Sequence, residues 1–211
     1  MRAAVPDGVP PTMTTRFVLV RHATCAQTHD VLYGRVIDAP LDAQGQQQAR
    51  ALARRVARLR PLLVQSSPRL RTRQTAAAIA TDAGCPVQAA DALDELDFGH
   101  WSGRRFEDLE ADPDWQRWNR ERGSSRTPAG TDIASVQARM DGHLQLLARA
   151  HPGHTLVLVT HAEVVRSALL KYLGRPAEAF LDMQVDPASF STLRFDQGGV
   201  HVEAINERAD A

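Results

Sequence analysis

Short apolar runs alternate with amphipathic helical patterns along most of the chain, and this alternation restricts the fold more than any other feature. The runs at residues 17–20, 62–64 and 156–159 are typical of buried strands and are far too short to span a membrane. Between them, apolar residues recur at helical spacing until a glycine or proline ends the segment. Strands that alternate with helices of a dozen or more residues indicate a parallel arrangement. We therefore expect an α/β fold, a three-layer α/β/α sandwich with a mostly parallel central sheet.

The same patterns predict the individual elements. The expected strands cover residues 16–21, 62–65 and 155–160, with a terminal hairpin at 190–195 and 200–205. The expected helices cover residues 45–59, 69–83, 132–150 and 163–173. The section 91–128 is less regular, but it holds all three tryptophans and is expected to be packed structure. No repeat or low-complexity tract divides the chain, so we expect a single domain over residues 16–211.

The N-terminal segment and the overall charge bear on location and partners. Residues 1–15 lack a continuous apolar core, do not resemble a secretion signal, and are expected to form a flexible leader on a cytoplasmic protein. The 25 basic and 25 acidic side chains balance, so no overall field would hold the chain on nucleic acid or a membrane. Two cysteines, Cys25 and Cys85, make neither a disulfide framework nor a metal site. The edge of the terminal hairpin is compatible with a homodimer, and a monomer is equally compatible.

Polar residues follow three of the expected strands at the point where each strand ends. Arg21 and His22 close the first strand, residues 66–71 follow the second, and Thr160 and His161 close the third. Open α/β sheets bind their ligands at the carboxyl ends of parallel strands. Two imidazoles and at least two guanidinium groups are therefore expected to face one pocket. Such a cluster suits a dianionic ligand, of which a phosphoryl group is the common example.

A phosphoryl group at this place needs a nucleophile and a proton donor. An imidazole with an ordinary pKa of about 6.5 can be neutral and nucleophilic at neutral pH. Residues 93–99 offer three carboxyl groups, and one of them, kept protonated by burial, would serve as a general acid: Asp94, Glu95 or Asp97.

Each of these residues also has a purely structural interpretation. The histidine at the first strand end is compatible with an ordinary buried polar residue, and His161 with a cap on the following helix. Glu95 is compatible with a surface carboxylate. A solvated helix face is the preferred interpretation of Arg69 and Arg73. The functional interpretation gains its strength from the edge of one sheet, which would gather all the candidate groups.

Segments in the same order and spacing resemble the histidine phosphatase superfamily, also called the phosphoglycerate mutase-like family. The pair Arg21 and His22 is similar to the family's Arg-His-Gly motif, and Glu95 precedes a segment similar to its Asp-Phe-Gly-x-Trp motif. The matching segments are residues 19–23, 33–49, 66–76, 95–103 and 159–166. The Trp101 motif with Trp115 and Trp118 also resembles α-ribazole phosphatases.

The resemblance implies a role for each matching residue. His22 would accept the phosphoryl group, and Glu95 would protonate the leaving alcohol and later activate water. Arg21, Arg71 and His161 would bind the transferred phosphoryl group. The family implies neither a metal ion nor a cofactor.

Several positions depart from the family pattern or extend it. Ala162 and Ala23 stand where glycines are usual, and both are small enough for the backbone to approach phosphate. Thr28 stands where many members have an asparagine that contacts phosphate. Asp132 replaces a serine but still suits a helix cap. Arg35, in the loop of residues 34–38, is expected to line the outer pocket together with side chains of the middle section.

Three functions remain open. The first is a phosphatase that hydrolyses a small phosphorylated metabolite. The second is a phosphoglycerate mutase, which would use the same catalytic residues but return the phosphoryl group to the substrate. The third is a member that binds phosphorylated ligands without turnover. The modest length favours the phosphatase, because mutases typically carry a longer insert after the acid residue.

Overall fold

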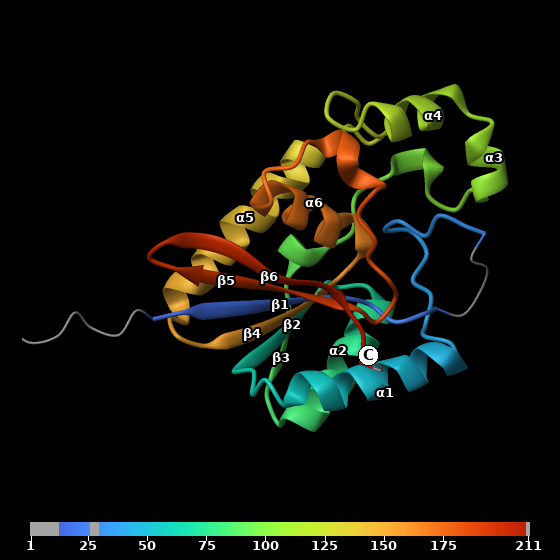
Figure 1. The fold of residues 1–211 in the computed structure, drawn as a ribbon. Coiled ribbons are helices and arrows are strands. Elements are labelled where there is room, and N and C mark those ends of the chain that lie inside the picture. Colours follow the sequence, from blue (N-terminus) through green and yellow to red (C-terminus); the bar gives the residue numbers. More distant parts are fainter. Residues whose placement is uncertain (1–12, 26–29, 210–211) are drawn as a thin grey trace, which may run out of the picture.

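The computed structural model describes residues 13–25 and 30–209, and in this part of the chain six strands form one sheet (Figure 1). The strands are β1 (Thr15–Arg21), β2 (Leu63–Ser66), β3 (Val87–Ala89), β4 (Thr155–Thr160), β5 (Phe190–Asp196) and β6 (Gly199–Glu207). Their order across the sheet is β3-β2-β4-β1-β5-β6. Strands β3, β2, β4 and β1 run parallel, while β5 and β6 form an antiparallel hairpin at one edge. The predicted mostly parallel sheet and terminal hairpin are confirmed.

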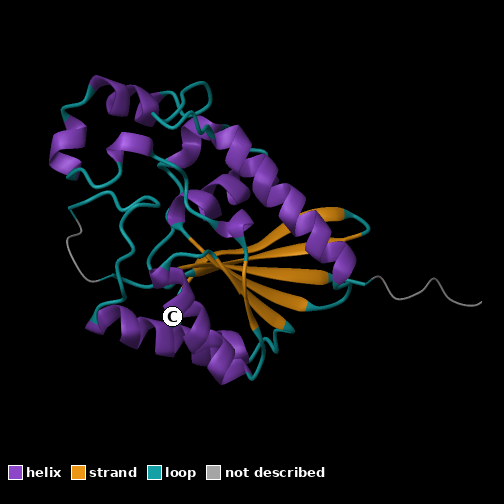
Figure 2. Cartoon of the chain, turned by 180° about the vertical axis from the view of Figure 1, so that it is seen from behind, coloured by secondary structure: helices purple, strands orange, loops and turns teal. Residues whose placement is uncertain are grey.

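Helices cover both faces of the sheet (Figure 2). The α-helices are α1 (Ala43–Ala57), α2 (Leu70–Ala83), α3 (Phe106–Glu110), α4 (Pro113–Arg120), α5 (Ile133–Ala150) and α6 (Ala162–Tyr172). Helices α1 and α2 lie on one face, and α5 and α6 lie on the other. Helices α3 and α4 lie beyond the carboxyl end of the parallel strands (Figure 1). The predicted α/β/α sandwich is confirmed, and none of the described helices is long and apolar enough to cross a membrane.

The middle residues of the central strands β1 and β4 are apolar because both faces of these strands are covered. In β1, Phe17 and Leu19 pack into the core beneath α5 and α6. Val18 and Val20 point to the opposite face and pack against α1 and α2. All four side chains are fully buried, and the burial of each contributes about 1.5–3 kcal/mol. This two-sided burial fixes the register of β1 and so the position of the residue that follows it.

Helix ends are set by local capping. Asp42 caps α1, where its carboxylate accepts a hydrogen bond from the backbone N–H of Gly45 at 2.6 Å. Asp132 caps α5 in a capping box with Ser135, as the sequence predicted. Gly84 ends α2 with a φ of 64°, a left-handed conformation that favours glycine. Each acidic cap stabilises its helix by about 1 kcal/mol.

The predicted strands and helices all exist, with bounds that differ by a residue or two. Strand β3 was not predicted, because its three residues are exposed and carry no apolar pattern. The middle section is packed structure, as expected, and it buries Trp101 and Trp118 almost completely. It contains two short 3-10 turns, η1 (Asp91–Leu93) and η2 (Gly99–Trp101), besides α3 and α4. A third 3-10 turn, η3 (Ala177–Phe180), follows α6.

Candidate active site

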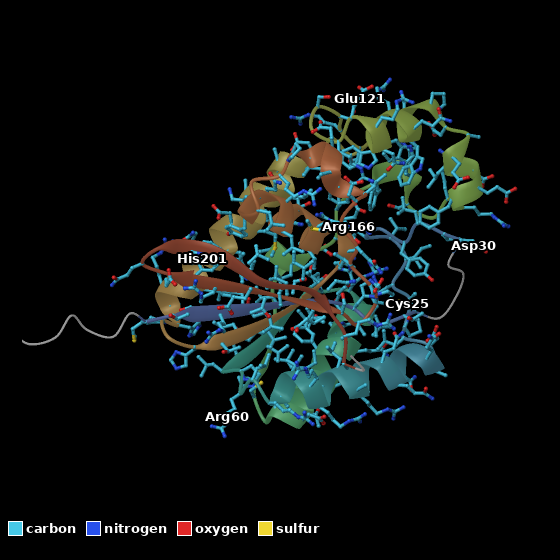
Figure 3. All side chains as sticks on the ribbon, in the orientation of Figure 1. Cys25, Asp30, Arg60, Glu121, Arg166 and His201 are labelled. Carbon is cyan, nitrogen blue, oxygen red and sulfur yellow. The ribbon has the colours of Figure 1, made fainter. Side chains whose placement is uncertain are left out.

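The polar residues that follow β1, β2 and β4 meet at the carboxyl edge of the sheet. A cavity of about 200 Å³ opens there. Four of the predicted site residues line it: Arg21, His22, Arg71 and Glu95. Cys25 lines it as well, and this residue lies at the end of the sheet opposite to His201 of the hairpin (Figure 3). The fold thus brings together groups that are far apart in the sequence.

His22, directly after β1, is held by its neighbour in the chain. Its Nδ1 lies 2.8 Å from the carbonyl oxygen of Ala23, so Nδ1 carries the proton and donates to that oxygen. The other ring nitrogen, Nε2, is then unprotonated and has a free lone pair. Burial lowers the pKa of His22 well below its ordinary value of 6.5, and the charges of Arg71 and Arg21 lower it further. His22 is therefore a neutral imidazole at neutral pH, able to act as a nucleophile.

Backbone carbonyls hold the guanidinium groups of Arg21 and Arg71. Arg21 Nη1 donates to the oxygen of Val185 at 2.6 Å. Arg71 donates from Nη2 to the oxygen of Gly34 at 2.9 Å and from Nη1 to that of Ile37 at 3.1 Å. The Nε–H groups of both arginines are buried and have no hydrogen-bond partner within residues 13–25 and 30–209. Buried cationic donors without a partner suit an anionic ligand.

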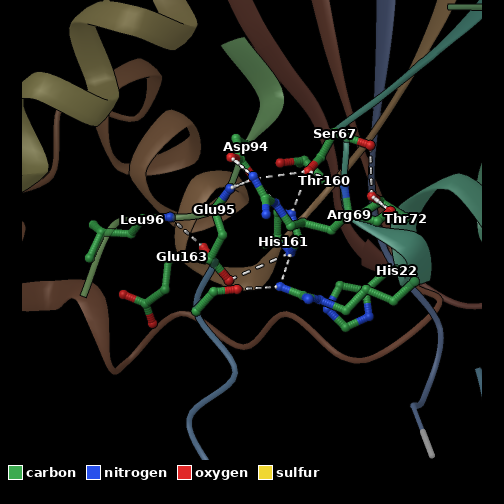
Figure 4. Close-up of polar contacts among 12 residues, drawn as sticks. His22, Ser67, Arg69, Thr72, Asp94, Glu95, Leu96, Thr160, His161 and Glu163 are labelled. Carbon is green, nitrogen blue, oxygen red and sulfur yellow. Dashed lines mark hydrogen bonds and ion pairs between the residues drawn. The ribbon is translucent and has the colours of Figure 1, made fainter. Parts of the chain in front are cut away.

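His161, between β4 and α6, packs against His22 with ring centroids 5.3 Å apart. Arg71 Nη2 lies 3.2 Å from Nδ1 of His161, and because a guanidinium only donates, Nδ1 is the acceptor. The proton of His161 then sits on Nε2, which donates to Ser67 Oγ at 2.8 Å. The Ser67 hydroxyl donates in turn to Asp94 Oδ1 at 3.2 Å (Figure 4). This chain of hydrogen bonds fixes the tautomer and the orientation of His161.

The carboxyl group of Glu95 has one engaged and one available oxygen. Its Oε1 accepts the backbone N–H of Leu96 at 2.9 Å. Its Oε2 lies 3.6 Å from Nδ1 of His161 (Figure 4). The backbone N–H of Glu95 donates to Asp94 Oδ1 at 2.8 Å, which fixes the residue in place. A proton on this carboxyl therefore belongs on Oε2.

The electrostatics of Glu95 favour that proton. Burial raises its pKa most, the Glu163 carboxylate raises it further and Arg71 opposes them, with a resulting value of about 7. About half of the Glu95 carboxyl groups are protonated at neutral pH. The group is therefore poised to give or accept a proton near neutrality.

Arg69 does not lie on a solvated helix face, so that interpretation is wrong. Its Nε and Nη2 form a bidentate pair with the two oxygens of Asp94, at 2.8 and 2.7 Å. The backbone of Arg69 is extended at the start of α2, and its side chain reaches the loop that carries Glu95. Arg73, one turn further along the helix, is exposed as predicted.

The structure places the other predicted site residues less centrally. Arg35 Nε donates to the backbone oxygen of Glu95 at 2.7 Å, and its guanidinium lies 3.5 Å from Asp94 and 3.8 Å from Asp97. The charge of Arg35 thus lies close to the carboxylates of Asp94 and Asp97. Ala162 is the first residue of α6, and the side chain of the preceding residue makes no capping hydrogen bond to that helix. Thr28 lies outside the described residues.

Sequence reasoning gave no role to Ser67, although it lies within a segment that matches the family. The partners of its hydroxyl, Asp94 and His161, are 27 and 94 residues away in the chain. The only sequence signal was the position of this serine directly after a strand, at the same sheet edge as the histidines.

The donor set of the site suits an anion better than a metal ion. Guanidinium groups carry no acceptor, and both imidazoles already use one ring nitrogen or both in hydrogen bonds. Within the described ranges, no three His, Cys, Asp or Glu side chains are grouped so that they could hold a metal ion.

The sequence and the fold are similar to those of known proteins. The family model of the histidine phosphatase superfamily (branch 1) matches residues 17–208. The chain belongs to this family, which confirms the resemblance seen in the sequence motifs.

Individual relatives are similar over most of their length. Phosphoserine phosphatase 1 of Hydrogenobacter thermophilus is 32% identical over 86% of this chain and 87% of its own. The adenosylcobalamin/alpha-ribazole phosphatase of Escherichia coli is 26% identical over 92% of this chain and 97% of its own. The structure of phosphoserine phosphatase from Entamoeba histolytica in complex with 3-phosphoglyceric acid superimposes with a TM-score of 0.82. It is 26% identical, and the match covers 92% of this chain and 97% of that one.

Proposed function

We propose that this enzyme hydrolyses small phosphate monoesters through a phosphohistidine intermediate on His22, with Glu95 as general acid and then general base. One observation carries the proposal. A neutral imidazole with an unprotonated Nε2, a carboxyl group with a pKa of about 7 and two arginines border one small cavity, and the buried Nε–H groups of these arginines have no partner among the described residues. The relatives named as phosphatases support the same conclusion.

In the first step, Nε2 of His22 attacks the phosphorus atom as the bond from phosphorus to the alcohol oxygen breaks. Glu95 transfers its Oε2 proton to the leaving oxygen. Arg21 and Arg71 hold the equatorial oxygens, so that guanidinium groups supply the positive charge that metal ions supply in other phosphoryl-transfer enzymes. The products are the free alcohol, a phosphorylated His22 and an ionised Glu95.

In the second step, the ionised Glu95 accepts a proton from a water molecule as its oxygen attacks phosphorus. The bond between phosphorus and Nε2 breaks, and the electron pair returns to the ring of His22. Inorganic phosphate is released, and both residues recover their initial protonation states. In each step, the Glu95 carboxyl group thus transfers one proton: to the leaving alcohol in the first step, and from water in the second.

The test is turnover of p-nitrophenyl phosphate in EDTA, together with trapping of acid-labile phosphoprotein after an alkaline quench. His22→Ala should abolish both signals, whereas His201→Ala, an exposed histidine at the far end of the sheet, should leave them unchanged. Normal labelling of His22→Ala would refute the role of this residue, and loss of wild-type turnover in EDTA would refute metal independence.

Two further outcomes separate the alternative functions. Interconversion of 2- and 3-phosphoglycerate that outpaces phosphate release would identify a mutase. Tight binding of inorganic phosphate without turnover of any ester would identify a binding protein.

A further inference from the structure

The cavity has a charged floor and an apolar outer wall. Its charged and titratable lining comes from the residues already described at the carboxyl edge of the sheet. Most of the remaining lining consists of apolar and aromatic side chains, which form the apolar wall of the cavity: Val31, Leu32, Tyr33, Phe106 and Pro187. The wall is the part of the site that would contact the alcohol of a bound phosphate ester.

Apart from Pro187, the wall comes from two segments, residues 30–34 and 103–106, which backbone hydrogen bonds join. The N–H of Leu32 donates to the oxygen of Arg104 at 3.0 Å, and the N–H of Gly103 donates back to Leu32 at 2.8 Å. The N–H of Phe106 donates to the oxygen of Asp30 at 2.7 Å. This short antiparallel pairing holds the wall in place before any ligand binds.

Aromatic packing supports the wall from behind. The Phe106 ring lies 6.3 Å from that of Trp115, which packs edge-on against the buried Trp101 at 5.2 Å. On the other side, the Arg71 guanidinium lies 5.8 Å from the centre of the Tyr33 ring. The two rings that line the cavity are thus each held by a neighbouring residue.

Cationic side chains near the wall have other partners. Arg104 pairs with Asp112 at 2.6 Å, and Arg105 lies 3.5 Å from Glu107. Among the described residues that line the cavity, Arg21 and Arg71 are the only arginines or lysines, and both belong to the phosphoryl site. A carboxylate on the alcohol would therefore lose its hydration beside the wall without gaining an ion pair.

An ammonium group on the alcohol meets a similar difficulty. The one carboxyl group among the described lining residues is that of Glu95, and the proposed reaction requires this group to be protonated in the first step. An uncharged alcohol avoids both problems, and an apolar group on it would gain contact with Tyr33 and Phe106.

We propose that the site selects phosphate monoesters of uncharged alcohols that carry an aromatic or other apolar group, over phosphorylated amino acids and hydroxy acids. The inference rests on the proposed function for its chemistry. It separates this enzyme from the relatives whose names specify phosphoserine, although one of them is 32% identical.

The test compares two esters that differ only at the far end of the alcohol, 3-phenylpropyl phosphate and 4-(phosphonooxy)butanoate, with phosphoserine and 3-phosphoglycerate alongside. We expect kcat/KM to be at least ~10-fold higher for the phenylpropyl ester than for any of the charged substrates. A higher value for phosphoserine, 3-phosphoglycerate or the butanoate would overturn the inference.

Variants localise the effect to the wall. Phe106→Ala should reduce the preference for the phenylpropyl ester by about 10-fold. Phe106→Leu, which keeps an apolar side chain and covers the case that the alanine variant does not fold, should retain most of the preference. Leu146→Ala, an exposed leucine on α5, is the matched control. An unchanged preference in a folded Phe106→Ala variant would also overturn the inference.

A binding measurement keeps the inference distinct from the proposed function. Calorimetric titration with 3-phenylpropylphosphonate and 3-carboxypropylphosphonate reports the preference of the pocket without turnover. If no ester is hydrolysed, the proposed function fails, and the two phosphonate affinities still decide the inference. Equal affinities, or tighter binding of the carboxylate, would contradict it.

Discussion

Replacement of Glu95 by glutamine tests the proton transfer on which the proposed reaction depends. At pH 7, a carboxyl group with the ordinary pKa of 4.5 is protonated in about 1 molecule in 300, whereas burial and Glu163 raise the pKa of Glu95 to about 7, where about half is protonated. The structure thus makes Glu95 an available acid at neutral pH.

The expected kinetics follow from this value. For esters of alkyl alcohols, kcat/KM should decline as pH rises through about 7, because the protonated form of Glu95 is lost. Glu95→Gln should lower kcat/KM for these esters by about 10²–10⁴-fold, or about 3–5 kcal/mol, and should remove the decline. For p-nitrophenyl phosphate, whose leaving group needs little protonation, the loss should be much smaller.

The assay is a pH profile of phosphate release from both esters for the wild type and two variants. For a given ester, the second ionisation of the substrate, near pH 6, affects the wild type and both variants equally. The difference between the pH profiles of these enzymes therefore reports the ionisation of the enzyme group. Asp97→Asn is the matched control, since Asp97 lies two residues away and outside the cavity lining. Equal losses on both esters, or an unchanged decline in Glu95→Gln, would refute the role of Glu95.

Two other predictions concern the support of the site and its stability. Ser67→Ala removes the acceptor of the His161 Nε2–H and should lower the free energy of unfolding in urea by about 1–3 kcal/mol; kcat should fall as well, and Ser67→Thr, which keeps the hydroxyl, should recover it. The raised pKa of Glu95 stabilises the fold below pH 4.5, and this contribution of about 3 kcal/mol should be lost as pH rises through about 7. Urea unfolding of the wild type and Glu95→Gln at pH 4.5 and 8 measures it, and identical pH dependence in both would contradict it.

The parts of the fold that could be predicted from the sequence are those in which the pattern of apolar residues reflects burial in the structure. The middle residues of β1 and β4 are apolar because helices cover both faces of these strands. Strand β3 lies at the sheet edge, and its residues are exposed. It is a strand because Val87 pairs with Val64 of β2. The sequence of a three-residue segment does not show which strand it pairs with.

The candidate site was predictable to the extent that topology alone determines it. His22 and His161 directly follow neighbouring parallel strands. The predicted α/β fold was therefore enough to predict that they lie together. The choice of Glu95 over Asp94 and Asp97 depended on the family resemblance. The physical distinction lies in contacts with residues distant in sequence, above all the pair of Arg69 with Asp94, which helical spacing could not reveal.

Burial favours the neutral forms of both His22 and Glu95, and this suits them to opposite roles in the proposed reaction. Burial favours the neutral form of an ionisable group, and it therefore lowers the pKa of His22 and raises that of Glu95. In the proposed reaction, the neutral imidazole is the nucleophile and the neutral carboxyl group is the acid. Burial also lowers the pKa of Arg21, but the ordinary pKa of an arginine is so high that the side chain keeps its charge at pH 7. Without this burial the arginines would stay charged as before, but Glu95 would be ionised at pH 7. Burial of these side chains is therefore what equips a phosphate-binding cluster for the proposed catalysis.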